Sequence, residues 1–142
     1  MLFKRLNRTD AERVFVVMQA NVANIAADDV VSLETNASSV DGVKINQPAT
    51  AIIAQHCVVG VADAAIANGA YGLVQIYGYR STSRVLASNG DQALAVALAP
   101  VSGQDYLSSF VSSTAIYPQF VLLESATSSN GTVSKKIFIR CM

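Results

Sequence analysis

Apolar and polar residues alternate with a period of two along much of this chain, a pattern that is typical of β-strands. The clearest alternation begins at Glu12, where Val14, Val16 and Met18 occupy every second position. Polar segments separate such stretches, and residues 21–29 are expected to form the first loop. The segments that we expect to be extended are 12–19, 29–35, 43–45, 50–62, 68–79, 92–99, 119–125 and 132–141.

One of these segments, residues 68–79, has bulky side chains on both of its faces. Three tyrosines and a leucine share one face and two β-branched residues share the other: Tyr71, Leu73, Tyr77 and Tyr79, then Val74 and Ile76. A strand that is apolar on both faces is usually covered on both faces, so we expect it to be central in its sheet. Gly72 and Gly78 indicate close backbone approach or a bend at this strand.

Four turn dipeptides separate the predicted strands: Asp41-Gly42, Asn68-Gly69, Asn89-Gly90 and Asn130-Gly131. Such dipeptides favour the positive φ values of tight turns. We therefore predict one antiparallel all-β domain over residues 12–142, a β-barrel or β-sandwich of about eight to ten short strands. The glycines expected to have structural roles are Gly42, Gly69, Gly72, Gly78, Gly90 and Gly131.

Residues 92–99 give two conflicting signals. Leu94, Val96 and Leu98 alternate with alanines, which indicates a strand, whereas the Ala and Leu content favours a helix. The preceding Asn-Gly pair and the following Pro100 favour the strand. One of its faces would then carry methyl groups alone, and we expect this face to support self-association: Ala93, Ala95, Ala97 and Ala99.

Residues 105–111 are the one place where a helix is expected. Leu107, Phe110 and Val111 have helical spacing and follow Asp105, a residue type that caps helix N-termini. The segment is short, so the sequence predicts at most one short helix here in an otherwise all-β domain.

The chain carries few charges, because only 14% of its residues are charged and 51% are apolar. Monomeric surfaces usually carry more charge, so we expect partners to cover much of this one; a neutral monomer coated with Ser, Thr and Ala is the alternative. Ten basic residues balance ten acidic ones, which gives no bias toward nucleic acid or an anionic membrane. From residue 45 to 79 the only charged residue is Asp63, which indicates core or interface.

Residues 1–11 mix apolar and basic side chains without a clear period. We expect an N-terminal arm that orders on contact with a partner, with a frayed terminus as the alternative. The arm lacks the continuous apolar region of a secretory signal. The longest apolar run, residues 93–101, is about half as long as a membrane-spanning helix, so we expect a soluble protein.

No residue pattern indicates an active site. His56 is the only histidine, and the adjacent Cys57 would point to the opposite face of a strand, so the two cannot share a proton. Asp28-Asp29 has no further ligand nearby in sequence to complete a metal site. Cys57 and Cys141 are expected to be free, buried thiols. We expect no enzymatic activity, cofactor, metal or small-molecule substrate.

Several stretches together resemble the small head proteins of tailed bacteriophages. The resemblance covers most of the chain from about residue 12 and is carried by strand residues and structural glycines rather than by a reactive group. Its most recognisable part runs from Ile66 to Tyr79. The other stretches are 13–17, 29–31, 41–48, 59–62 and 136–140.

This resemblance implies a capsid decoration, or cement, protein. Such a protein is a β-rich domain on the outer surface of the virion, made in the host cytoplasm, that bridges neighbouring copies of the major capsid protein. It would also associate with itself, most simply as a homotrimer at local threefold positions. We expect the arm to bind the capsid, its cations meeting acidic loops and its apolar side chains adding contact area: Lys4, Arg5 and Arg8, then Leu2, Phe3 and Leu6.

Two other classes of function stay open. One is a β-barrel or β-sandwich binding module for glycans on a host surface. The other is a different virion component, such as a head–tail or tail protein of similar fold.

Overall fold

The structure, a computed structural model, describes residues 12–35, 41–48, 57–87, 94–101, 103–109, 119–126 and 131–141. These residues form one 11-stranded sheet, so the predicted all-β fold is confirmed. The described residues contain no helix with the length and apolar character to cross a membrane. The strands are β1 (Arg13–Ala20), β2 (Val30–Leu33), β3 (Lys44–Asn46), β4 (Val58–Ala62), β5 (Tyr71–Arg80), β6 (Arg84–Leu86), β7 (Ala97–Pro100), β8 (Leu107–Ser109), β9 (Phe120–Leu122), β10 (Thr132–Ser134) and β11 (Ile137–Arg140).

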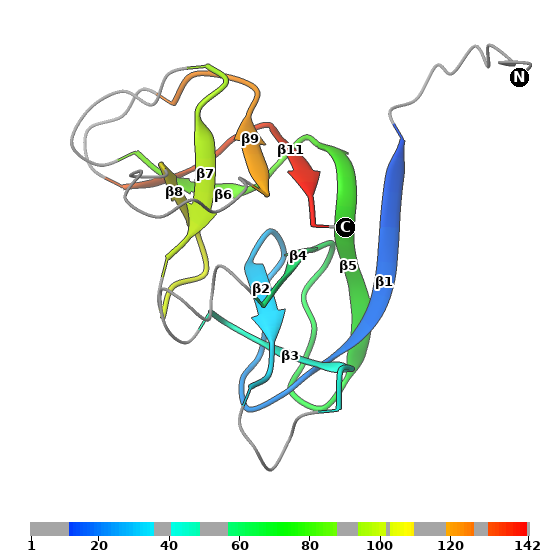
Figure 1. Cartoon of the computed structure of the whole chain (residues 1–142). Helices are drawn as coiled ribbons and strands as arrows, with labels where there is room; N and C mark the ends of the chain where they lie inside the picture. Colours follow the sequence, from blue (N-terminus) through cyan, green and yellow to red (C-terminus); the bar gives the residue numbers. More distant parts are fainter. Residues whose placement is uncertain are drawn as a thin grey trace, which may run out of the picture.

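Five of the strands close a barrel in the order β1-β3-β2-β4-β5, because β5 also pairs with β1. The β1–β5 pairing is antiparallel and runs from Arg13 opposite Gly78 to Gln19 opposite Tyr71. Figure 1 shows these two long strands lying side by side along one wall of the molecule. Closure leaves no unpaired edge within the ring, which makes it a stiff body.

The other strands extend from β5 in the order β11-β9-β7-β8-β6-β10. In Figure 1, β6 to β9 lie on the far side of β5 and β11 from β1. β5 therefore belongs to both halves of the fold: it pairs with β1 and β4 in the barrel and with β11 outside it. This agrees with the prediction that residues 68–79 are central in the sheet.

Each half has its own apolar core. Inside the barrel the buried side chains come from β1 to β5 and the loops between them: Met18, Ala20, Ile25, Val31, Ile45, Ala62, Ile66 and Val74. The second core includes Val30, Val58 and Val61 from β2 and β4, together with side chains from later strands: Val85, Leu98, Leu107, Phe120, Leu122, Ile137 and Ile139. The alternating pattern of the sequence thus supplies the inward face of most strands.

Close approach at the glycines of β5 is confirmed. Gly78 has φ 101°, and a Cβ there would overlap the carbonyl group of Glu12. A Cβ at Gly72 would overlap the side chain of Ile66. Gly60, which the sequence did not single out, is equally constrained because a Cβ there would overlap the carbonyl oxygen of Gln75. Only a residue without a side chain fits at such crossings.

Two of the four predicted turns lie in the described part of the chain. Gly69 has φ 78°, and the Ala70 amide donates to the Ala67 carbonyl at 2.9 Å, which closes a tight turn. Gly42 has φ 73° and follows Asp41, whose carboxylate accepts the amide of Val43 at 2.9 Å. The other two dipeptides fall partly or wholly outside the described residues; of them only Gly131 is described, and Gly90 lies outside.

The short helix expected near 105–111 does not form over the described residues. Leu107–Ser109 is β8, which pairs with β7, and residues 110 and 111 lie outside the described part. Asp105 does not cap a helix; its carboxylate contacts the guanidinium of Arg84. Leu107 is fully buried in the second core, and this tertiary contact outweighs a local helical spacing.

The strand expected over 92–99 is shorter and shifted. β7 is Ala97–Pro100, and Leu94 and Ala95 form a turn in which Ala95 has φ 66°. Ala95 is therefore not part of the strand face that carries Ala97 and Ala99, and Ala93 lies outside the described residues. Strand was nevertheless the correct choice over helix for this segment.

The strand order also differs from a simple succession of hairpins. β1 pairs with β3, and β6 with β8, in parallel, although the other pairings are antiparallel. β9 and β11 form an antiparallel pair, whereas Thr132–Ser134 pairs with β6 instead. The 11 strands exceed the expected eight to ten. Residues 84–86 and 107–109 form β6 and β8, which were not expected as strands, and the extended run 132–141 is split between β10 and β11.

Candidate functional site

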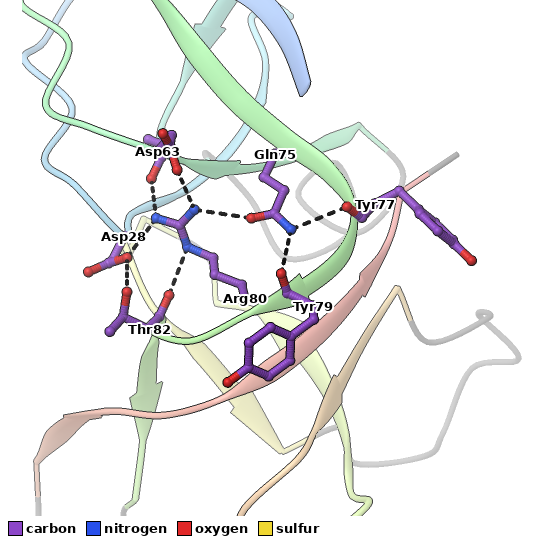
Figure 2. Close-up of polar contacts among 8 residues, drawn as sticks. Asp28, Asp63, Gln75, Tyr77, Tyr79, Arg80 and Thr82 are labelled. Carbon is purple, nitrogen blue, oxygen red and sulfur yellow. Dashed lines mark hydrogen bonds and ion pairs between the residues drawn. The ribbon is translucent and has the colours of Figure 1, made fainter. Parts of the chain in front are cut away.

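Arg80, the last residue of β5, lies at the centre of a buried polar cluster between the two halves of the fold (Figure 2). Its side chain is 6% exposed. Its donors reach five acceptors: Asp28 Oδ1 at 2.7 Å and the Ala62 carbonyl at 2.8 Å from Nη2, Asp63 Oδ1 at 3.2 Å and Gln75 Oε1 at 3.3 Å from Nη1, and the Thr82 carbonyl at 2.7 Å from Nε. A guanidinium has five N–H donors, so every donor of Arg80 has an acceptor.

Gln75 extends the cluster along β5. Its side chain is 1% exposed, and its Nε2 donates to the carbonyls of Tyr77 at 3.2 Å and Tyr79 at 3.0 Å. Figure 2 shows the amide lying between Arg80 and these carbonyls. A buried amide costs stability unless it is hydrogen-bonded, and here both ends of it are.

A second arginine continues this arrangement one strand later. Arg84 of β6 contacts Asp105 and lies 3.2 Å from Asp29 Oδ1. Asp29 is 2% exposed, and its other oxygen accepts the Ala26 amide at 2.8 Å. Burial raises the pKa of Asp29, and the hydrogen bonds from Ala26 and Arg84 oppose that rise.

These two arginine clusters tie several loops together at the junction. The donors of Arg80 are all in use, so it offers none to a substrate anion. Among the described residues, no group of three His, Cys, Asp or Glu side chains could hold a metal ion. The clusters connect the loop before β2, the loop after β4 and the β5–β6 connection, which fixes how the barrel meets the second half.

A separate feature is an exposed apolar surface on the barrel wall formed by β1 and β5. We call it the β1–β5 face and define it by Val17, Tyr71 and Leu73. Their exposed fractions are 61%, 63% and 47%. Val17 lies directly opposite Leu73 in the β1–β5 pairing, so both side chains point to the same side. Tyr71 is two residues from Leu73 and shares that side. Large apolar side chains gathered in this way indicate a contact surface.

This exposure corrects one prediction. Residues 68–79 were expected to be covered on both faces, yet Tyr71 and Leu73 are exposed at the start of β5. Tyr71 and Leu73 are not covered because the second half contacts β5 near its other end, where β11 pairs with residues from Tyr77 to Arg80. Of the two readings of the uncharged stretch, core or interface, core does not apply to Tyr71 and Leu73, and interface stays a prediction.

The loop after β1 exposes a further apolar residue in a strained conformation. Val22 has φ 76° and is 69% exposed. A β-branched residue at positive φ is an outlier that costs on the order of 1–3 kcal/mol. The loop is held by a hydrogen bond from the Asn68 amide to Asn24 Oδ1 at 2.9 Å, which places it beside the Asn68-Gly69 turn.

The predicted contact residues have different outcomes. Those of the arm, Leu2, Phe3, Lys4, Arg5, Leu6 and Arg8, lie outside the described residues, as do Ala93, Gly90 and His56. Ala97 and Ala99 are half-buried in β7, and Ala95 is exposed in the preceding turn. Self-association through these alanines stays a prediction. Cys57 and Cys141 are free thiols, as expected, and both are half-buried.

The arginine clusters were missed by sequence reasoning. Asp28 and Asp29 were judged a loop pair without partners nearby, but their partners Arg80 and Arg84 are 52 and 55 residues away. The available signal was a pair of arginines four residues apart at the end of an otherwise uncharged strand, next to polar Thr and Ser residues. A charge at the end of a buried strand needs a partner, although sequence alone does not say which.

Comparison of the chain with protein-family models and with curated proteins finds no match to either. The functional proposal below therefore depends on the resemblance carried by the residues themselves and on the geometry just described.

Proposed function

We propose that this chain is a capsid decoration protein of a tailed bacteriophage, bound on the outer surface of the head, where it stabilises contacts between major capsid subunits. The observation that carries the proposal is the β1–β5 face. Its residues Tyr71 and Leu73 lie in the stretch 66–79 that gives the strongest resemblance, and they are exposed instead of packed in a core. Exposed apolar residues that serve no core support a role within an assembly, in which neighbouring copies cover them.

The architecture suits this role. A cement protein needs a stiff body with several contact surfaces, and a closed barrel braced by the buried Arg80 is such a body. It stabilises a shell by binding the assembled lattice more tightly than free subunits. Many copies acting together convert modest single contacts into strong attachment.

Attachment to the shell is assigned in this proposal to the N-terminal arm. Leu2, Phe3 and Leu6 supply apolar contact, and Lys4, Arg5 and Arg8 supply positive charge for acidic capsid loops. Polar steering of this kind sets orientation and association rate as well as affinity.

Co-sedimentation with expanded, undecorated heads of the phage tests the proposal. The full chain is expected to saturate the heads at a fixed number of copies and to raise their resistance to heat. Deletion of residues 1–10 is expected to weaken binding at least about tenfold while the domain stays folded. If the full chain does not bind heads, the proposed function is wrong; if the deletion variant binds with unchanged affinity, only the role of the arm is.

One observation favours a second candidate, a glycan-binding module. Tyr71 is 63% exposed on a stiff strand, and an exposed aromatic ring is a stacking platform for sugars. Binding of the purified protein to a glycan array, abolished by Tyr71→Ala, would favour this alternative. Location of the protein in the tail or neck of the particle would instead favour another virion component.

A further inference from the structure

We infer that the β1–β5 face is the surface through which copies of this chain bind one another, so that Val17, Tyr71 and Leu73 of one copy are covered by the same face of the next. This inference concerns the purified protein in solution and does not depend on the proposed role at the capsid. The surface differs from the alanine face of residues 93–99, for which self-association stays a separate prediction.

The face is preorganised for contact. Residues 15–19 of β1 pair with residues 71–75 of β5 without interruption, and a bulge occurs only before Phe15. On the inward side, Val16 lies opposite Val74 and packs with the barrel core. Since that side of the two strands is already packed, the strands cannot rotate to bury Val17 and Leu73. A partner that covers such a surface orders few side chains on binding, which lowers the entropic cost.

The face itself carries no formal charge, and the charged residues beside it are paired. Lys44 of β3 lies opposite Gln19, which in turn lies opposite Tyr71, and the Lys44 Nζ is 3.1 Å from Asp41 Oδ2. Residues 14–27 and 64–79, which include β1 beyond Arg13, most of β5 and the loops at that end of the barrel, contain no Asp, Glu, Lys or Arg. The nearest charges after these stretches, Asp28, Asp63 and Arg80, are paired with one another. Two copies that meet here therefore bury no unpaired charge. They avoid the desolvation cost that burial of such a charge carries.

The lack of charge also indicates which molecule covers the β1–β5 face. The N-terminal arm carries Lys4, Arg5 and Arg8, and this face has no carboxylate to receive them. A different protein is normally oriented by complementary charge, which this face does not offer. A second copy presents an identical neutral, apolar surface, and the chain as a whole has ten basic and ten acidic residues, so copies do not repel one another. The copies of a closed oligomer are related by a rotation axis. The same few apolar residues of the β1–β5 face therefore form the contact in every copy.

Sedimentation equilibrium of the full chain with Leu73→Arg tests the inference, because it places a charge at the centre of the face. The matched control is Leu94→Arg, since Leu94 is 64% exposed but lies in the turn before β7. We expect wild type and Leu94→Arg to form the same dimer or trimer. Leu73→Arg should weaken association at least about 30-fold, the loss expected for an interface hot spot.

Two further variants keep the result decisive. Val17→Lys provides a second charged substitution opposite Leu73, and circular dichroism establishes that each variant is folded. Deletion of residues 1–10 distinguishes the arm as occupant and is expected to leave association unchanged. A monomeric wild type, association that survives both charged substitutions, equal loss in Leu94→Arg, or loss on deletion of the arm would each overturn the inference.

Discussion

The guanidinium of Arg80 donates to Asp28 Oδ1 at 2.7 Å, and the two residues are 52 positions apart in the chain. This contact joins the end of the central strand to the loop before β2. The same arginine also donates to the Ala62 carbonyl at the end of β4 and to the Thr82 carbonyl before β6. One side chain thus connects four segments at the junction between the barrel and the second half.

Arg80→Ala should destabilise the protein strongly. It leaves Gln75 Oε1 and two carbonyls without the Arg80 donor, and it leaves Asp28 Oδ1 with only the Thr82 hydroxyl as a donor, at 2.9 Å. Removal of one partner from a buried charge pair typically costs about 3–5 kcal/mol in the free energy of unfolding. Asp63 adds less to this loss, since its side chain is 43% exposed and water screens its charge. Urea unfolding followed by circular dichroism measures the change.

The control for that measurement is Lys136→Ala. Lys136 is 50% exposed and pairs with Glu124 at 3.4 Å, a surface ion pair that contributes about 0–1 kcal/mol. Arg80→Lys keeps the charge but supplies only three donors, so it should remain clearly destabilised. Equal stabilities of the Arg80 and Lys136 variants would show that the cluster does not brace the fold.

Asp29→Asn should change how stability depends on pH. The pKa of Asp29 is raised by burial, so the folded protein binds the proton more tightly than the unfolded chain does. The contribution of Asp29 is therefore full below the pKa of a free aspartate, about 4, and is lost as the pH rises through the folded-state pKa. The stability of Asp29→Asn relative to wild type should increase from pH 4 to pH 7 in urea titrations at about half-unit steps.

Asp41→Asn provides a control with the opposite sign. The Val43 amide hydrogen bond, with further contributions from Lys44, lowers the pKa of Asp41, so its contribution is present above the pKa of a free aspartate and lost as the pH falls through the lower folded-state value. The stability of Asp41→Asn relative to wild type should therefore not increase over the range in which that of Asp29→Asn does. The same trend in both variants would contradict the assignment of burial as the dominant effect on Asp29.

Gly78→Ala should prevent normal pairing of β5 with β1. The new Cβ would overlap the Glu12 carbonyl, and φ 101° is a conformation that residues with side chains rarely adopt. We expect a loss of several kcal/mol, or failure to fold, on the scale of about 3 kcal/mol or more for backbone incompatibility. Gly131→Ala, with nothing within 4 Å of the new Cβ, should stay within about 0.5 kcal/mol of wild type in thermal unfolding.

The thiol of Cys141 should be protected in the folded protein. Burial against the second core raises its pKa to about 12, so almost none of it is thiolate at pH 8. In a Cys57→Ser background, alkylation by iodoacetamide should be on the order of 1,000-fold slower in buffer than in urea. Comparable rates in the two conditions would show that the C-terminal end of β11 does not remain packed.

The sequence predicts the strands better than it predicts their partners. Alternation of apolar residues places β1, β2 and β5 within three residues of their observed ends. Gly78 marks a close approach of backbone to backbone, and Gly72 marks a close approach of the Ile66 side chain. The same patterns do not predict which strands pair with one another. No local feature of the sequence predicts that β10 pairs with β6, or that β1 and β3 pair in parallel.

The candidate sites show the same division. An uncharged stretch around β5 indicates core or interface, but only the packing of the second half decides that Tyr71 is exposed while Gln75 is 1% exposed. The partners of Arg80 come from three separate segments, so no spacing in the sequence reveals the cluster. The helix expected near Asp105 fails for a related reason, since Arg84 takes the carboxylate that would have capped it.

Electron cryomicroscopy of the phage particle, with the gene for this chain intact and deleted, tests the central proposal most directly. The account predicts density for a β-barrel domain on the outside of the head, repeated with the symmetry of the capsid lattice and absent after deletion, in heads that become less resistant to heat or low salt. Intact and deletion heads with identical surfaces, or density for the chain only in the tail, would contradict it.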